Sequence, residues 1–178
     1  MIVEEFSLHI PFGNIYVKKW TPTCLCSEIP VVLLHDSLGS SDLWNDFPQT
    51  LAKILLRPVI AYDRLGFGKS DARQALPSNQ FIEEEAISYF PQIKSALGVT
   101  HYILLGHSVG GAMAINIAAF DNQCIAVITI AAQAFVEEIT LQGIQAAKKS
   151  FQDSKQMEKL DKWHGEKAEW VLKAWTEI

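Results

Sequence analysis

Apolar residues in this chain gather in short blocks that alternate with longer stretches of mixed polarity. Each block is wholly apolar, which is typical of a strand buried on both faces of a parallel sheet. The blocks occupy residues 30–34, 59–62, 102–105 and 125–131. Two further runs, residues 6–10 and 15–20, flank a Pro-Phe-Gly-Asn turn and predict an antiparallel hairpin at the start of the chain.

Three stretches between these runs have the spacing of helices. Residues 42–56 place leucines and a phenylalanine on one stripe, with Asp42 as the predicted N-cap. Residues 78–97 predict a helix that stops at Gly98 and is kinked or divided at Pro91. Residues 108–120 predict a helix of small residues. Strands and helices in alternation predict an α/β fold, a mostly parallel sheet with helices on both faces.

After Ala134 the pattern changes to polar amphipathic helix, which carries Trp163, Trp170 and Trp175. We therefore divide the chain into a core, residues 1–134, and a helical segment, residues 135–178. Open parallel sheets bind ligands at the carboxyl ends of their strands. Residues with functional side chains follow the predicted strands at these ends, at positions 35–37, 63–64 and 106–108.

Composition narrows the function classes. The chain has 178 residues, 49% of them apolar, which suits one domain with a sizeable core. Its 15 Lys and Arg against 20 Asp and Glu give a net charge of −5, so we expect no nucleic acid partner. No apolar run reaches the ~18–20 residues that span a bilayer, and no signal peptide pattern opens the chain, so we expect no membrane partner. The three cysteines fit neither a disulfide framework nor a zinc site, so we expect a cytoplasmic protein without metal or cofactor.

One pentapeptide has the pattern of a catalytic turn. Residues 106–110, Gly106-His107-Ser108-Val109-Gly110, fit G-x-S-x-G between a buried strand and a helix. Such a turn lifts the central hydroxyl above the sheet, and its glycines let neighbouring backbone pass without a Cβ clash. The helix N-terminus that follows favours an anion. The alternative is an ordinary strand-turn-helix connection in which Ser108 is only an N-cap.

Together with two other motifs, this pentapeptide resembles the α/β-hydrolase family, and the resemblance covers nearly the whole chain. Residues 35–40, His-Asp-Ser-Leu-Gly-Ser, match the family's oxyanion loop, and residues 63–70, Asp-Arg-Leu-Gly-Phe-Gly-Lys-Ser, match its D-x-x-G-x-G-x-S turn. The resemblance implies that Ser108 is the nucleophile and that the N–H groups of Val109 and Ser37 hold the oxyanion. It also implies that residues 135–178 form a helical cap. Asp36 departs from the family, which usually has glycine there, and its carboxylate opposes the developing charge unless it points away or pairs with a cation.

A second glycine-rich stretch and several histidines need separate interpretation. Residues 66–70 resemble the end of a phosphate-binding loop, but Asp63 stands where that loop requires glycine, so we interpret the turn as structural. In a G-x-S-x-G turn the His107 side chain points away from the serine, so we expect it to pack or hydrogen-bond. We expect three other histidines at the surface or solvated: His9, His101 and His164.

The walls of a substrate pocket are harder to assign. His35 and Trp163 are our candidates for residues that line it. The three tryptophans of the helical segment either roof an apolar pocket or pack against the sheet, and the sequence leaves both alternatives open.

The acid and the histidine that activate the serine follow it in this family, on strands after the cap. Neither precedes Ile178, so we expect this chain to be the N-terminal part of a serine hydrolase, truncated before both partners. Residues 125–131 would then form an open sheet edge. Such an edge predicts a homo-oligomer, a swapped dimer, poor solubility or completion by a second polypeptide.

The leading hypothesis for function is hydrolysis of a small ester or related acyl substrate through an acyl-serine intermediate. The residues do not separate this reaction from carbon–carbon bond hydrolysis or cofactor-free haloperoxidase activity, which occur on the same fold. Dehalogenation is disfavoured because that branch of the family has aspartate in place of Ser108. The alternative is a non-catalytic remnant or binding module that keeps the fold, and the position of Asp63 argues against nucleotide binding.

Overall fold

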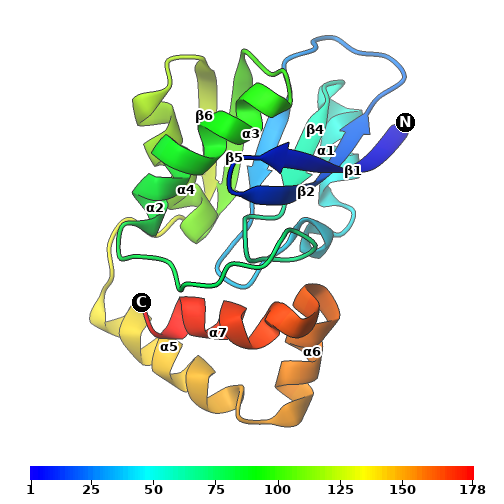
Figure 1. The fold of residues 1–178 in the computed structure, drawn as a ribbon. Coiled ribbons are helices and arrows are strands. Elements are labelled where there is room, and N and C mark those ends of the chain that lie inside the picture. Colours follow the sequence, from blue (N-terminus) through cyan, green and yellow to red (C-terminus); the bar gives the residue numbers. More distant parts are fainter.

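The computed structural model describes residues 1–178 and is built on a six-stranded sheet with the order β1-β2-β4-β3-β5-β6. An antiparallel hairpin forms one edge, and four strands run parallel in the rest of the sheet (Figure 1). The hairpin pairs with the parallel strands through an antiparallel contact between β2 and β4. The predicted α/β architecture and its N-terminal hairpin are therefore confirmed. The strands are β1 (Ile2–Ile10), β2 (Gly13–Thr21), β3 (Val31–Leu34), β4 (Val59–Tyr62), β5 (Tyr102–His107) and β6 (Cys124–Ile130).

Helices cover both faces of the sheet, as the wholly apolar strands predict. Successive residues of β3 belong to different cores, because side chains alternate across a strand. Val31 and Leu33 pack in the core under α1 (Phe47–Leu55), whereas Val32 and Leu34 pack in the core under α3 (Phe90–Ala96) and α4 (Val109–Phe120). The central strands thus bury their apolar side chains on both faces of the sheet, which fixes their register.

The helix predicted over residues 42–56 is divided, and Asp42 is not its N-cap. Residues Ser41–Trp44 form a short 3-10 helix, η1, and α1 begins only at Phe47. Asn45 between them has a φ of 50°, which breaks the helical path. Pro48 lies in the first turn of α1, the position where a missing N–H costs nothing. The proline signal favours a helix start here over the start that the apolar stripe predicts.

The division predicted at Pro91 is confirmed, and it takes the form of a π-helix. Helix α2 (Phe81–Glu84) continues into the π-helix η2 (Glu85–Tyr89) and then into α3, with Pro91 in the first turn of α3. Proline has no N–H to donate to the preceding turn, so a wider turn ahead of it loses little. The helix begins at residue 81, because residues 78–80 form a turn in which Phe81 N–H donates to the Ser78 carbonyl. Gly98, which has a positive φ, follows the end of α3.

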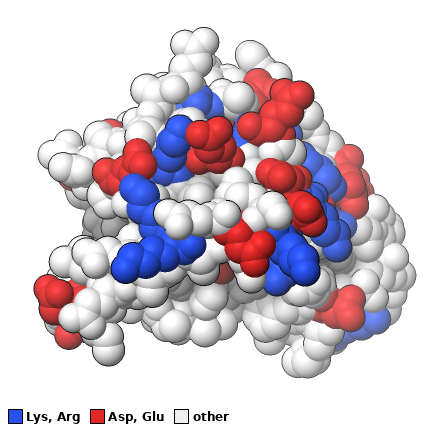
Figure 2. Space-filling model, turned by 90° about the horizontal axis from the view of Figure 1, so that it is seen from below, with Lys and Arg blue, Asp and Glu red and all other residues white.

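The C-terminal helices α5 (Glu138–Ser150), α6 (Ser154–His164) and α7 (Ala168–Thr176) lie together beyond one end of the sheet (Figure 1). A small core joins them to the loop after β4, where Phe67 packs with Leu160, Ala168 and Val171. The face that these helices present carries basic and acidic side chains interspersed, with no continuous block of either sign (Figure 2). No helix in the structure combines the length and apolar character that crossing a membrane demands.

Candidate active site

The connection from β5 to α4 forms a tight corner with Ser108 at its apex. Ser108 has φ 54° and ψ −122°, a conformation that a residue with a Cβ rarely adopts. Its N–H donates to the Ile130 carbonyl of β6 at 2.9 Å, so the corner is tied to the neighbouring strand. The side chain is half-buried at the N-terminus of α4, at the carboxyl end of the sheet. This is the strained strand-to-helix turn that the G-x-S-x-G pattern predicts.

Two glycines permit this corner because backbone passes them at very short range. A Cβ on Gly106 would lie 2.1 Å from the Gly110 carbonyl oxygen. A Cβ on Gly110 would lie 2.2 Å from the Leu34 carbonyl oxygen of β3. The corner therefore packs directly against the end of β3, and the loop that follows β3 is held next to Ser108.

Two backbone N–H groups at this corner have no acceptor in the chain. Val109 is the first residue of α4, where N–H groups have no helical partner, and Ser37 lies in the loop after β3. Both residues line one cavity beside the corner. Free N–H groups favour a negatively charged oxygen, and Val109 adds the favourable position of a helix N-terminus.

Asp36, the departure from the family pattern, is engaged by neighbouring groups. Its Oδ1 accepts from Leu38 N–H at 3.1 Å, and its Oδ2 lies 3.2 Å from His107 Nδ1. The His107 ring also packs edge-on near Trp44. The carboxylate is thus partnered within its own loop and by the histidine beside Ser108.

His35 does not line the cavity, in contrast to our expectation, because it is buried as a link between two loops. Its Nδ1 donates to the Asp36 carbonyl at 2.8 Å, and its Nε2 accepts from Arg64 N–H at 3.1 Å. Burial and the nearby Arg64 charge hold the pKa of His35 well below its usual range. The ring is therefore neutral, and it joins the loop after β3 to the loop after β4.

A buried aspartate fastens the same two loops at a second point. Asp63 accepts from Ser41 N–H at 2.5 Å and from Lys69 N–H at 2.7 Å. Gly68 passes so close that a Cβ there would overlap the Asp63 carboxylate. Burial raises the pKa of Asp63, and the two N–H donors oppose that rise by favouring the ionised form. The glycine-rich turn thus closes on Asp63, as the structural interpretation of residues 66–70 predicts.

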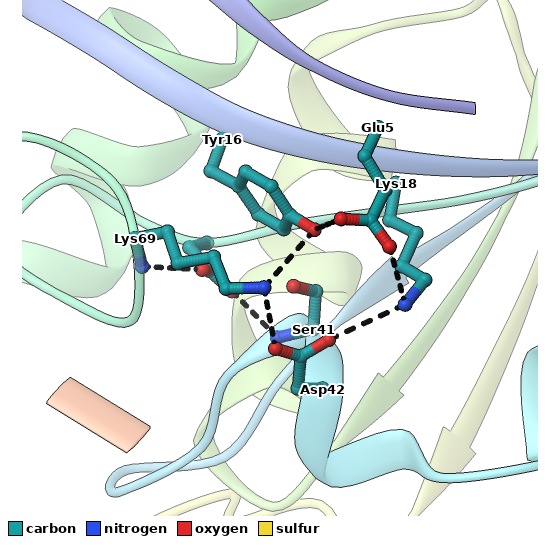
Figure 3. Close-up of polar contacts among 7 residues, drawn as sticks. Glu5, Tyr16, Lys18, Ser41, Asp42 and Lys69 are labelled. Atoms are coloured by element: carbon teal, nitrogen blue, oxygen red, sulfur yellow. Dashed lines mark hydrogen bonds and ion pairs between the residues drawn. The ribbon is translucent and has the colours of Figure 1, made fainter. Parts of the chain in front are cut away.

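Outside this aspartate, a chain of ion pairs ties the loop to the hairpin. Asp42 pairs with Lys69 at 2.8 Å and Lys18 at 3.4 Å, and Lys18 pairs with Glu5 at 2.8 Å. Tyr16 Oη donates to Glu5 at 2.6 Å, and Figure 3 shows these side chains converging around Asp42. Residues of β1 and β2 therefore brace the loop that carries Ser37.

His164 is buried, and the expectation that it is solvated is wrong. The side chain is only 2% exposed. Its Nδ1 accepts from Gly68 N–H at 2.8 Å, and its Nε2 donates to the Leu38 carbonyl at 3.0 Å. Burial lowers the pKa of His164, with the Leu38 carbonyl acting in the opposite sense. His164 therefore joins α6 to both loops of the site. By contrast His9 and His101 are exposed, as expected.

The cavity beside the corner has a volume of about 350 Å³ and reaches from the loop after β3 to the C-terminal helices. Trp163 does not line it; its ring lies near Lys162 at the surface of α6. Trp175, in the last turn of α7, takes the place we expected for Trp163. Helical periodicity alone could not decide which tryptophan faces inward, because that depends on how α6 and α7 pack. The wall includes Ser37, Val109, Phe81, Met113, Ile144 and Trp175.

Three charged residues line this wall: the sequence placed Arg64 at the carboxyl edge of the sheet without assigning it to a pocket, and it gave no indication of Arg73 or Glu85. Arg64 directly follows β4, at the carboxyl edge where ligands bind, and that position was the available signal. Glu85 gave no signal, because a glutamate within a polar helical stretch is usually solvated. Ser108 itself is adjacent to the wall through Val109 and does not form part of it.

A family model described as alpha/beta hydrolase fold matches residues 29–176. A 1-acylglycerol-3-phosphate O-acyltransferase ABHD5 of Sus scrofa is 35% identical over 117 residues, 64% of this chain and 32% of its own. A proline iminopeptidase of Lactobacillus delbrueckii subsp. lactis is 29% identical over 112 residues, 60% of this chain and 36% of its own. The chain therefore spans about a third of the length of these curated relatives.

Solved structures agree on the fold. Proline iminopeptidase from Mycobacterium smegmatis superposes with a TM-score of 0.60 at 25% identity, over 70% of this chain and 42% of that one. Carboxylesterase CesB from Bacillus subtilis gives a TM-score of 0.62 at 23% identity, over 77% of this chain and 46% of that one. The relatives of this chain include esterases, peptidases and acyltransferases. The family model covers well over half of the residues of this chain. This chain belongs to the α/β-hydrolase fold family.

Proposed function

We propose that the protein is a serine hydrolase that cleaves a small ester or related acyl substrate, with Ser108 as the nucleophile. Two features carry the proposal: Ser108 occupies a strained strand-to-helix corner, and the N–H groups of Val109 and Ser37 have no acceptor in the chain. Acyl transfer requires a nucleophile near donors for a negative oxygen, so these features support the proposal.

In the proposed reaction Ser108 Oγ attacks the substrate carbonyl and loses its proton to a base. The carbonyl oxygen becomes an oxyanion, which the two N–H groups hold. Collapse of this intermediate breaks the bond to the leaving alcohol, which takes up the proton and departs, and water then releases the acid from the serine. Loss of one oxyanion donor typically costs about 3–4 kcal/mol of barrier, so the placement of Ser37 is a main determinant of rate.

None of the chain's five histidines has a hydrogen bond to the Ser108 hydroxyl. His35 and His164 use both ring nitrogens in other contacts, His107 contacts Asp36 through Nδ1, and His9 and His101 are exposed. We propose that the base and its acid partner belong to the part of the α/β-hydrolase fold that corresponds to the remaining length of the relatives. A serine without its base retains only weak reactivity.

The relatives support acyl chemistry in general. Their names describe acyl transfer, cleavage of carboxylic esters and release of amino acids from peptides, reactions that all begin at an acyl carbonyl. They do not select one substrate among these classes.

Labelling with a fluorophosphonate, which reacts with activated serines, tests the proposal. Because no base contacts Ser108 in this chain, we expect slow labelling, so the protein is incubated with a large excess of probe. Peptide mass spectrometry should then find the adduct on the peptide that contains Ser108, and lose it in Ser108→Ala. Ser154→Ala, at the exposed start of α6, is the matched control and keeps the label. Absence of any adduct from a protein that circular dichroism shows to be folded would overturn the proposal.

The second candidate, a binding module without catalysis, is favoured by the commitment of the buried histidines to other partners. It predicts an unlabelled Ser108 together with an intact cavity that still binds ligands. The same labelling experiment therefore separates the two functions.

A further inference from the structure

The cavity beside Ser108 has a charged wall that the proposed acyl chemistry does not use. Three charged residues contribute to it: Arg64, Arg73 and Glu85. Arg64 and Glu85 are each only 5% exposed, so both groups are held out of water. Burial of a charge is costly unless partners satisfy it. The hydrogen-bond partners of these two groups therefore indicate which of their polar atoms remain available to a ligand.

The Arg64 guanidinium is incompletely paired. Its Nη2 donates to the Asp36 carbonyl at 2.7 Å, and its plane lies over the Phe67 ring, 4.3 Å from the centroid. Its Nη1 has only the Met113 sulfur, at 3.6 Å, and a thioether accepts hydrogen bonds weakly. Met113 and Arg64 both line the cavity. Nη1 is thus a buried donor without an oxygen acceptor, at the wall of an open space.

Glu85 is also half-satisfied. Tyr62 Oη donates to its Oε1 at 2.6 Å, and Oε2 has no hydrogen bond within the chain. Glu85 opens the π-helix η2, a kind of turn that is frequent at functional sites. Burial raises the pKa of Glu85, while the Tyr62 hydroxyl and the two arginines act against that rise.

The charges of this wall do not cancel. Two arginines face one carboxyl group, and no other charged side chain lines the cavity. Arg73 forms an ion pair with Glu84 at 3.5 Å, which offsets part of its charge, so the Arg64 guanidinium is the main cation of the wall. A guanidinium in a low-dielectric site binds planar, two-oxygen anions best, because its N–H groups match their geometry. A cationic group would instead meet the like charge of Arg64.

We propose that this wall is a carboxylate subsite, so that the substrate is an acyl compound with a second carboxylate away from the carbonyl that Ser108 attacks. A half-ester of a short dicarboxylic acid has this chemistry. The inference rests on the proposed function for the ester end of the substrate. It assigns Arg64 as the residue that determines specificity and Arg73 as a supporting charge.

Binding to the Ser108→Ala protein tests the subsite without needing turnover. Three esters of matched length serve as probes: monomethyl glutarate, methyl pentanoate and methyl 5-aminopentanoate, which end in a carboxylate, a methyl group and an ammonium group. Titration is followed by NMR or calorimetry. We expect the half-ester to bind about tenfold or more tightly than the neutral ester, as a charge-assisted hydrogen bond implies.

Variants in the Ser108→Ala background assign the effect to residues. Arg64→Gln should bring the half-ester to the affinity of the neutral ester, and Arg73→Gln should weaken it several-fold. Glu85→Gln should keep the preference, because it removes no positive charge. Arg64 also holds the Asp36 carbonyl, so circular dichroism checks the fold of Arg64→Gln, and Arg73→Gln tests the charge if that variant does not fold.

Equal binding of the half-ester and the neutral ester would overturn the subsite, as would preference for the ammonium ester. A folded Arg64→Gln protein that keeps the full preference would also overturn it. If Ser108 resists fluorophosphonate but the half-ester still binds through Arg64, the subsite stands and the proposed catalytic function fails. The two proposals are therefore separable.

Discussion

At the scale of single residues, the Ser108 corner depends on glycines, because a Cβ at these positions would collide with neighbouring backbone. Gly110 sits where a Cβ would meet the Leu34 and His35 carbonyl oxygens, at 2.2 and 2.6 Å. Backbone at such range cannot move without shifting β3 or the loop after it. The strain at Ser108, with its positive φ, persists because these surroundings over-determine it. A substitution at Gly110 therefore acts on stability and on the site together.

We predict that Gly110→Ala lowers the free energy of unfolding by about 2–3 kcal/mol, as overpacking of a tight contact does. It should also abolish labelling of Ser108, because the corner must open to admit the methyl group. Gly143→Ala is the matched control: Gly143 lies exposed in α5, and a Cβ there meets nothing within 4 Å. Alanine should stabilise that helix by about 0.5–1 kcal/mol. Urea denaturation measures both, and an unchanged Gly110→Ala midpoint would contradict the prediction.

The role of a residue was predictable where it depends on neighbours in the sequence, and not where it depends on residues far away along the chain. The Ser108 corner follows from five consecutive residues, since the glycines and the strand-to-helix transition are visible together. His164 offered no such signal, because its partners Gly68 and Leu38 lie 96 and 126 positions away. Trp163 and Trp175 have equivalent surroundings in sequence, and only the packing of α7 decides which one faces the cavity.

At the scale of elements, the site is an assembly of two loops held together by buried polar groups. His35 joins the loop after β3 to Arg64, Asp63 joins it to Lys69, and His164 joins both loops to α6. The two histidines make these links as neutral rings, because each accepts a backbone N–H through one ring nitrogen. The C-terminal helices are thus coupled to the loop that carries Ser37, and loss of a link should be felt in stability.

The His164 link predicts a pH dependence. Its folded pKa lies below the unfolded value because burial disfavours the charged ring, and the neutral ring accepts from Gly68 N–H. The unfolded chain therefore binds a proton more readily than the folded chain, so the free energy of unfolding falls as pH drops below about 6.5. His35 acts in the same direction.

Urea denaturation between about pH 8 and pH 5, a range that brackets the histidine pKa, measures this slope. We expect His164→Gln to cost about 1–3 kcal/mol at neutral pH, since buried groups lose their partners, and to flatten the slope without removing it. His101→Gln, at an exposed position, should leave both unchanged. A slope that is the same in His164→Gln and in the natural protein would contradict the assignment.

Among the elements, buried strands were predictable and helix boundaries less so. A parallel strand covered on both faces must be apolar throughout, so β3, β4, β5 and β6 stand out from the sequence. The start of α1 was misplaced because the apolar stripe continues through η1. The helical conformation is nevertheless interrupted at Asn45, which has a positive φ. The π-helix was visible only as a break at Pro91, since its extra width depends on how Glu85 and Tyr89 pack at the cavity.

At the scale of the whole molecule, β6 is the feature that a stable monomer would not expose. It is the edge strand of the sheet, and every residue of it from Ile125 to Ile130 is exposed, with Ile125 at 50% and Ile128 at 44%. The strand has no charged residue and no proline, the devices that usually protect an edge. An edge of this kind can pair antiparallel with a second copy of itself about a two-fold axis, an arrangement that closes on itself.

We therefore predict that the 178-residue chain self-associates through β6. A lysine in the middle of the strand should prevent it, because pairing two copies would bring two like charges together at the centre of the new sheet contact. Sedimentation velocity over a range of concentrations should show dimers or larger species for the natural chain and a shift to monomer for Ile128→Lys. Gln152→Lys, which adds the same charge at an exposed position between α5 and α6, should leave the association intact. A natural chain that stays monomeric at every concentration would contradict the prediction, and association that Ile128→Lys does not weaken would move the interface to another surface.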